Sequence, residues 1–143
     1  MDVAHWLVKQ EPTDYPWSQF VEEKKAAWTG VRNYQARNHL RGMRKNHPVL
    51  YYHSGDEKRV VGVAKVLREA YPDPTAKDGD WSAVDISPVT PLQHPVSLVA
   101  IRADANLKSI LLVRNSRLSV IPLSKAEFTR ILELASAPES GVD

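Results

Sequence analysis

The apolar positions near the middle of the chain mark out one amphipathic helix followed by a buried strand. Ala36, Leu40 and Met43 follow one another at i, i+4 and i+7, which predicts a helix over Asn33–Arg44 with a single apolar face. Arginines recur at the same spacing on a different face of this helix: Arg37, Arg41 and Arg44. We therefore expect the helix to pack on a core and to present cations away from it.

The remaining elements follow from alternating or helical spacing of apolar residues. Strands are predicted over His5–Lys9, Val49–Ser54, Arg59–Tyr71, Trp81–Val89 and Leu118–Pro122. Further helices are predicted over Ser18–Lys24, Ser97–Arg102, Leu107–Val113 and Ser124–Ala135. The first of these should turn Phe20 and Val21 inward, and the last opens with a capping box, in which Ser124 and Glu127 satisfy each other's backbone N–H groups. Pro88 and Pro91 are expected to end the fourth strand.

Five strands joined mostly by hairpin-length connections and interrupted by short helices indicate an α+β fold with a curved or barrel-like sheet. Gly62 lies inside the longest predicted strand, where a glycine indicates a bulge or the close approach of another group to the backbone. The sequence contains no repeat or linker. We expect one domain over residues 1–137 and a flexible tail over 138–143.

Composition narrows the classes of protein. The chain has 143 residues, 43% of them apolar and 25% charged, as in globular proteins. It has no cysteine, which excludes disulfides and thiolate metal sites, and no apolar run near the roughly 20 residues of a membrane helix. Residues Met1–His5 lack the features of a signal peptide. We expect a monomeric cytoplasmic protein, in a bacterial cytosol rather than a nucleus, with no membrane partner.

Enzyme signatures are absent from the sequence. The five histidines form no His-x-x-x-His pair, no Gly-x-Ser-x-Gly turn is present, and no glycine lies in a phosphate-binding loop. We therefore expect no metal, no cofactor and no catalytic residue. One enzymatic alternative stays open, in which Glu11 or Asp85 serves as a general base toward a nucleobase or nucleotide.

Binding is better supported than catalysis. The net charge is only +2, so an anionic partner must meet a local patch, and Arg32–Lys45 is the densest one. Trp28 stands two residues before Gly30 and shortly before an Arg-Asn-Tyr cluster, which suits a pocket for a flat polar ring beside a phosphate. The alternatives are that Trp28 is a core residue and that the arginine face is simply solvated. Trp17 and one of the pair Tyr51 and Tyr52 are expected in the core.

Long motifs in a fixed order resemble the EVE domain family over nearly the whole chain. They are Trp6–Pro12, Trp28–Asn38, Tyr52–Ser54, Lys65–Asp73, Trp81–Asp85 and Arg117–Leu123. The resemblance implies a PUA-like fold related to YTH and ASCH domains. It also implies binding of DNA or RNA through a modified base inserted in a small pocket. The loop Pro72–Asp80 is shorter than expected for eukaryotic relatives, so a rim built by that loop would be reduced.

On this interpretation the protein is a non-enzymatic reader of a modified nucleobase. Trp28 and Trp81 would supply ring faces, while Asn33 and Ser54 would bond the base edge. The full set expected at the base pocket is Trp6, Trp28, Val31, Arg32, Asn33, Tyr34, Ser54 and Trp81. Flanking phosphates would be neutralised by Lys9, Arg32, Arg37 and Arg41. A third class, a protein-interaction module that uses the arginine face, also stays open.

Overall fold

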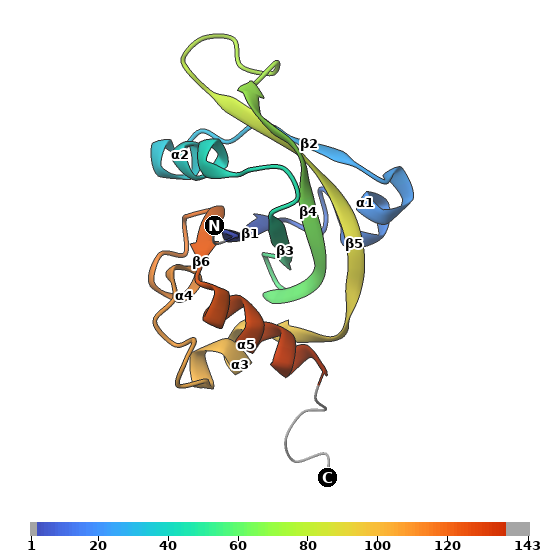
Figure 1. Ribbon diagram of the computed structural model, residues 1–143, viewed down its shortest axis with the longest axis vertical. Helices are drawn as coiled ribbons and strands as arrows, with labels where there is room; N and C mark the ends of the chain where they lie inside the picture. Colours follow the sequence, from blue (N-terminus) through green and yellow to red (C-terminus); the bar gives the residue numbers. More distant parts are fainter. Residues whose placement is uncertain (1–2, 137–143) are drawn as a thin grey trace.

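Six strands form one curved sheet in the order β2–β5–β4–β3–β1–β6 in the computed structural model, which describes residues 3–136 (Figure 1). The strands are β1 (His5–Gln10), β2 (Ala26–Trp28), β3 (Pro48–His53), β4 (Arg59–Pro72), β5 (Ser82–Ser97) and β6 (Val120–Leu123). β1 runs parallel to β3, and all other neighbours are antiparallel. β2 and β6 are the two edges, so the sheet curves without closing. The predicted α+β class with a curved sheet is confirmed.

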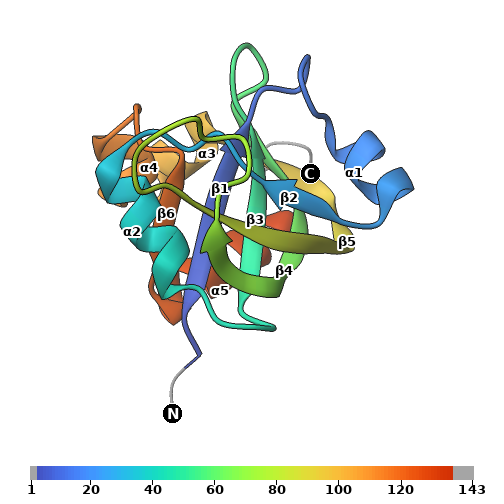
Figure 2. The same ribbon diagram turned by 90° about the horizontal axis from the view of Figure 1, so that it is seen from above.

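Five helices connect these strands: α1 (Trp17–Glu23), α2 (Tyr34–Gly42), α3 (Leu98–Ala103), α4 (Leu111–Arg114) and α5 (Lys125–Ser136). Figures 1 and 2 show the long, bent β4 and β5 wrapping around β1 and β3, with α2 and α5 packed at different places along them. No helix within residues 3–136 has the length and apolarity to cross a bilayer.

The predicted register of α2 is confirmed. Ala36, Leu40 and Met43 are fully buried, and the Asn33 side chain caps the helix by accepting a hydrogen bond from the Ala36 backbone N–H at 2.9 Å. The capping box that opens α5 is also present: the Ser124 and Glu127 side chains each accept from the other residue's backbone N–H. Local sequence signals therefore position both helices.

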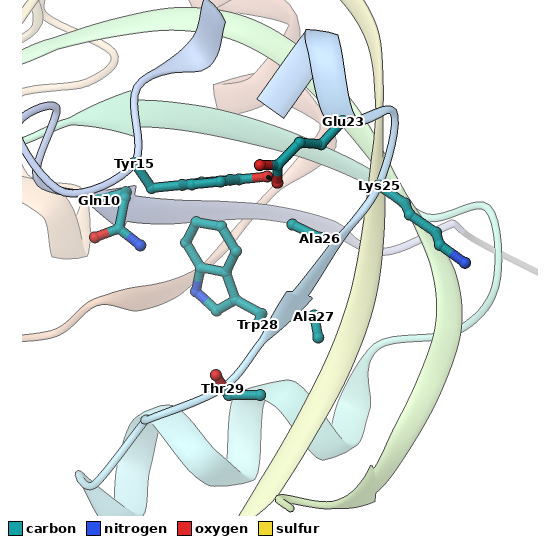
Figure 3. Close-up of a pocket in the computed structure, with 8 residues that line it drawn as sticks. All are labelled: Gln10, Tyr15, Glu23, Lys25, Ala26, Ala27, Trp28 and Thr29. Carbon is teal, nitrogen blue, oxygen red and sulfur yellow. Dashed lines mark hydrogen bonds between the residues drawn. The ribbon is translucent and has the colours of Figure 1, made fainter. Parts of the chain in front are cut away.

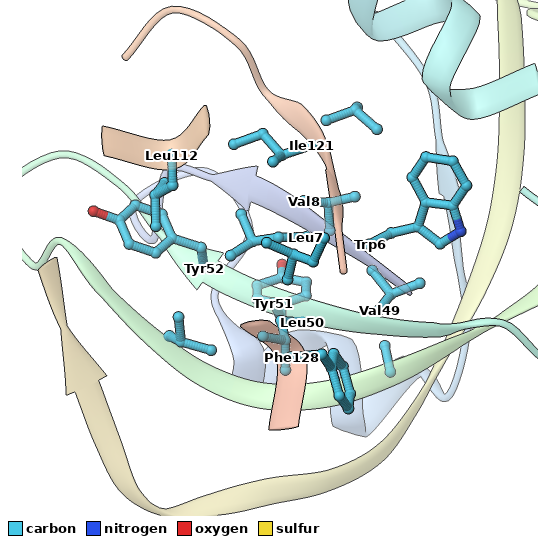
Figure 4. Close-up of a cluster of buried hydrophobic side chains, with 14 of the residues drawn as sticks. Trp6, Leu7, Val8, Val49, Leu50, Tyr51, Tyr52, Leu112, Ile121 and Phe128 are labelled. Atoms are coloured by element: carbon cyan, nitrogen blue, oxygen red, sulfur yellow. The ribbon is translucent and has the colours of Figure 1, made fainter. Parts of the chain in front are cut away.

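The core lies on both sides of the central strands. Tyr51 and Tyr52 point to opposite sides of β3, yet both are buried (Figure 4). The expectation that only one of them is a core residue is wrong, because consecutive residues of β3 are buried and both faces of this strand are therefore covered. Trp17 packs edge-on against Tyr51, with ring centroids 5.4 Å apart, as expected of a core-packing residue.

Three element predictions need correction. β5 continues through Pro88 and Pro91, because beyond Ile86 it has no partner on the β2 side and a missing N–H there breaks no ladder. Val21 on α1 is 44% exposed rather than inward. Within Leu107–Val113, only the part from Leu111 is helical.

The interruption at Gly62 is confirmed in both of its predicted forms. The pairing of β4 with β5 shifts register between Val60 and Gly62. A Cβ on Gly62 would lie 2.5 Å from the Trp17 ring, so the indole rests directly on the glycine backbone. The predicted tail falls outside the described residues.

Candidate functional site

A pocket of about 280 Å³ opens between β2, the end of β1 and the end of α1 (Figure 3). It is lined by Gln10, Tyr15, Glu23, Lys25, Ala26, Ala27, Trp28 and Thr29. Its volume is near the lower end of the roughly 300–1,000 Å³ of small-molecule sites, so it suits one ring system rather than an extended ligand.

The rings of Tyr15 and Trp28, together with Ala26 and Ala27, form the apolar part of this pocket. β2 pairs with β5 and presents Trp28, which is only 6% exposed. The buried ring of Tyr51 meets the Trp28 ring edge-on, with centroids 5.7 Å apart, and its hydroxyl donates to the backbone oxygen of Tyr15 at 2.6 Å. One core residue therefore holds both Trp28 and Tyr15 in place.

Polar groups lie on opposite sides of the two rings (Figure 3). The Tyr15 hydroxyl donates to Glu23 Oε1 at 2.7 Å, and Gln19 Nε2 donates to Glu23 Oε2 at 3.0 Å. These bonds from Gln19 and Tyr15 lower the pKa of Glu23 and keep it an acceptor, while burial raises the pKa of Tyr15. On the other side, Gln10 Oε1 accepts from the Glu11 backbone N–H at 3.0 Å, so its amide group remains as a donor.

The segment after β2 is fastened to the β4–β5 loop. Gly30, at φ 80°, donates its backbone N–H to Asp73 Oδ2 at 2.8 Å, and Arg32 Nη1 donates to the same oxygen at 2.9 Å. Thr75 donates to Asp73 Oδ1 through its N–H and its hydroxyl, at 2.7 and 2.6 Å. Burial acts to raise the pKa of Asp73, but the bonds from Thr75, Arg32 and Gly30 outweigh it and hold this pKa well below its usual range.

Beyond this clamp lies an aromatic cluster on the surface. The rings of Tyr34 and Trp81 stack with centroids 5.0 Å apart and an interplanar angle of 20°. The guanidinium of Arg32 lies over the Trp81 ring at 5.5 Å, and that of Arg37 lies 5.0 Å from the Tyr34 ring. We refer to Tyr34, Trp81, Arg32 and Arg37 as the surface stack.

The structure divides the residues predicted for the base pocket. Trp28 both lines the pocket and packs in the hydrophobic core, whereas Arg32, Tyr34 and Trp81 belong to the surface stack. Val31 is buried in the core, and the Asn33 side chain is used by the helix cap. Trp6 is directed elsewhere: its indole donates to His47 Nδ1 at 3.1 Å and packs against Gly42. The Ser54 backbone N–H donates to the Gln10 carbonyl at 2.9 Å, which places Ser54 beside the pocket without lining it.

The predicted phosphate-binding cations already have intramolecular partners. Arg41 forms an ion pair with Asp80 at 2.7 Å and donates to Ser82 Oγ at 2.9 Å, while Arg37 donates to the Asp80 backbone oxygen at 3.1 Å. Lys9 donates to the Ser116 backbone oxygen at 2.7 Å, and burial lowers its pKa. A phosphate would have to share or displace these interactions.

The two carboxylates considered as general bases lie outside the pocket lining. Asp85 accepts a hydrogen bond from the Tyr71 hydroxyl, and Glu11 packs against Gly55. No group of three or more His, Asp or Glu side chains within residues 3–136 is placed to hold a metal ion.

Sequence reasoning missed most of the pocket lining. Gln10 lies within a motif that carries the family resemblance, and Tyr15 is a large aromatic inside a turn, but neither position was predicted as part of the site. The strand that presents Trp28 has only three residues, too few to show alternation.

A model of the EVE domain matches residues 4–134. The chain belongs to the EVE domain family. Thymocyte nuclear protein 1 of Gallus gallus is 36% identical over 167 aligned positions, which cover 92% of this chain and 68% of the relative. The structure of Rpa0253 from Rhodopseudomonas palustris shares 41% identity and a TM-score of 0.89, with 99% of each chain covered.

The EVE fold has also been solved with a nucleic acid. Human THYN1 protein in complex with DNA containing 5-methylcytosine matches at 29% identity and a TM-score of 0.88, covering 95% of this chain and 99% of that one. The YTH domain of Zygosaccharomyces rouxii MRB1 protein, solved with N6-methyladenosine RNA, matches at 16% identity and a TM-score of 0.59, covering 100% and 93%. This second likeness concerns the fold alone: YTH domains are among the structural neighbours of this chain.

Proposed function

We propose that this EVE domain binds nucleic acid and recognises a modified base without chemically changing it. The observation that carries the proposal is the pocket at Trp28, where two aromatic rings, a primary amide and a carboxylate converge within about 280 Å³. Family membership supports it, since a human member has been solved with DNA containing 5-methylcytosine. Removing a base from its stack costs a few kcal/mol of free energy, which stacking on the pocket rings and hydrogen bonds to the base edge can offset.

The polar groups favour a base with an exocyclic amine. The Glu23 carboxylate accepts hydrogen bonds and has room for more, because each ionised carboxylate offers about four lone-pair sites. Gln10 offers an amide donor on the opposite side of the rings (Figure 3). A cytosine or adenine derivative presents an exocyclic amine as a donor to the carboxylate, and it has acceptor atoms on its other edges for the amide on the opposite side. Uracil and thymine present a carbonyl where the amine would be.

Binding without turnover fits the charge state of the pocket. A general base for work near neutral pH needs a raised carboxylate pKa, and the pKa of Glu23 is lowered by its bonds from Gln19 and Tyr15. We expect a modified oligonucleotide incubated with the protein to keep its mass. A change in mass that depends on Glu11 or Asp85 would support the enzymatic alternative instead.

The proposal is tested by the affinity of the protein for nine-nucleotide single strands that differ only in the central base. The pairs are cytosine and 5-methylcytosine, and adenine and N6-methyladenine, each as DNA and as RNA. We expect at least one modified strand to bind tenfold or more tightly than its unmodified partner. Trp28→Phe should reduce this ratio, whereas Trp6→Phe, a change at an equally buried tryptophan outside the pocket lining, should not. Equal affinity within every pair would contradict the proposal.

A further inference from the structure

The surface stack includes a largely exposed aromatic ring, that of Tyr34, which the pocket does not use. Tyr34 is 67% exposed, the second most exposed of the large hydrophobic side chains among residues 3–136. A tyrosine this exposed gains little stability from burying its ring, and a smaller polar residue would serve as well at the surface. Tyr34 also does not line the pocket. Core packing therefore does not explain a tyrosine at this position.

Trp81 holds this ring in a fixed position. Tyr34 stacks on it at 5.0 Å, and Arg32 lies over the indole at 5.5 Å. The backbone at Gly79 approaches the indole so closely that a Cβ there would lie 2.7 Å from its Nε1. Trp81 is thus covered by its neighbours. Tyr34 is the more exposed aromatic ring of the stack, and the guanidinium of Arg37 lies over part of it.

The charge around the stack suits a nucleic acid strand. Arg37 lies 5.0 Å from the Tyr34 ring, and its guanidinium is exposed on the same side of α2 as Arg41. Single-stranded nucleic acids bind where aromatic side chains stack on bases and cations follow the backbone. A ring with arginines beside it provides both kinds of interaction.

The stack is also continuous with the pocket. Thr29 lines the pocket, the next residue Gly30 bonds to Asp73, and Asp73 bonds to Arg32 of the stack. Trp28 and Tyr34 are six residues apart, a distance of about 20 Å at most for an extended chain. At about 3.4 Å per stacked nucleotide, a strand of at most about six nucleotides spans the gap between them.

We propose that Tyr34, backed by Trp81, is a second stacking site that holds a base flanking the modified one. This inference rests on the proposed function, since it takes the partner to be a single strand that also enters the pocket. Stacking on one tyrosine face is tolerant of base identity, so the site should add affinity without adding preference.

The test combines protein variants with abasic strands. The probes are the modified strands of the preceding test and their unmodified counterparts, each lengthened to thirteen nucleotides so that six lie on either side of the central base. Tyr34→Ala should weaken both strands of each pair by about fivefold to a hundredfold, the usual effect of removing one base–aromatic stack, and should leave their ratio unchanged. Tyr34→Phe should bind as the wild type does, because the ring is kept, and Tyr34→Leu should bind as Tyr34→Ala does.

Abasic residues placed in turn at each flanking position then locate the stacked base. At one position, on one side of the modified base, the abasic strand should weaken wild-type binding, and Tyr34→Ala should cause no further loss there. Unchanged affinity of Tyr34→Ala for intact strands, or losses that add at every position, would overturn the second site. If the two strands of every pair bind equally but Tyr34→Ala still weakens all of them, the pocket proposal fails and the second site stands. If the preference for the modified base persists and Tyr34→Ala has no effect on affinity, the second site fails and the pocket proposal stands. If no strand binds, both proposals fall.

Discussion

Gly30 donates its backbone N–H to the carboxylate of Asp73 at 2.8 Å, which joins the segment after β2 to the β4–β5 loop. The same carboxylate accepts bonds from Arg32 and Thr75, and its side chain is fully buried. The pocket at Trp28 and the surface stack therefore have a common support.

Replacing Asp73 should destabilise the fold. Asp73→Ala leaves several donors without an acceptor, and we expect it to lower the free energy of unfolding by about 3 kcal/mol. Asp78→Ala is the matched control, because Asp78 is an exposed carboxylate in the same loop. Urea denaturation followed by tryptophan fluorescence measures both variants. Equal stability of the two would mean that the clamp contributes little.

The lowered pKa of Asp73 predicts how its contribution varies with pH. Since the folded-state pKa lies below the unfolded one, the ionised group stabilises the fold fully above the unfolded pKa of about 4. The contribution is lost as the pH falls from there through the folded-state pKa. The difference in unfolding free energy between wild type and Asp73→Asn should be constant from pH 7 to 5 and shrink below about pH 4. A difference that grows on acidification would contradict this sign.

Because the Trp17 ring lies so close to Gly62, substitutions at these two positions should have non-additive effects on stability. Gly62→Ala should cost about 1–3 kcal/mol of stability, because the added methyl group must displace an indole that also packs against Phe20 and Tyr51. In a Trp17→Leu background the same change should cost much less. Additive losses in the double variant would show that the ring is not what the methyl group meets.

The arginine face predicts a change in salt dependence. Each cation that no longer neutralises a phosphate of a single strand should lower the slope of log affinity against log salt by about 0.7, so Arg37→Gln with Arg41→Gln should lower it by up to about 1.4. Arg130→Gln on α5 is the control, since Arg41 and Arg130 have equally exposed side chains, each paired with an aspartate. An unchanged slope in the double variant would assign Arg37 and Arg41 to holding Asp80 alone.

The pocket carboxylate predicts selectivity among bases. Glu23→Gln should weaken binding of the preferred amine-bearing base by about tenfold, within the roughly 1–3 kcal/mol of a good hydrogen-bonded pair at a base edge. Glu22→Gln removes the same charge from the neighbouring residue of α1, which does not line the pocket at Trp28. Affinities measured for both variants separate a direct interaction from a general change in charge. Equal effects would leave the carboxylate without a specific role.

The sequence predicts this fold well where the signal is local. The apolar spacing of Ala36, Leu40 and Met43 and the capping box at Ser124 each depend on residues within a few positions, and both are confirmed. The continuation of β5 through Pro88 depends on the absence of a neighbouring strand on one side, which is a property of the whole sheet. Such long-range facts are not encoded in the spacing of nearby residues.

In the candidate site, too, local sequence predicts some features, whereas contacts between distant residues could not be predicted. Trp28 is predicted as a pocket residue from its neighbours in sequence, and the structure places it on a pocket wall. Its partner ring Tyr15 comes from thirteen residues earlier, held there by the hydroxyl of Tyr51. Tyr34 and Trp81 are expected in the pocket, but they meet each other instead because the Asp73 clamp draws the β4–β5 loop over the start of α2. Only the folded chain reveals that pairing.

Entry of the modified base into the pocket at Trp28 can be followed by nuclear magnetic resonance of the four tryptophan indole N–H groups. The protein is titrated with the preferred modified strand and, separately, with its unmodified counterpart. We predict that the Trp28 signal shifts strongly with the modified strand and much less with the unmodified one, while the Trp6 and Trp17 signals stay in place. An unmoved Trp28 signal together with a shifted Trp81 signal would contradict the account, because it would place the base on the surface stack.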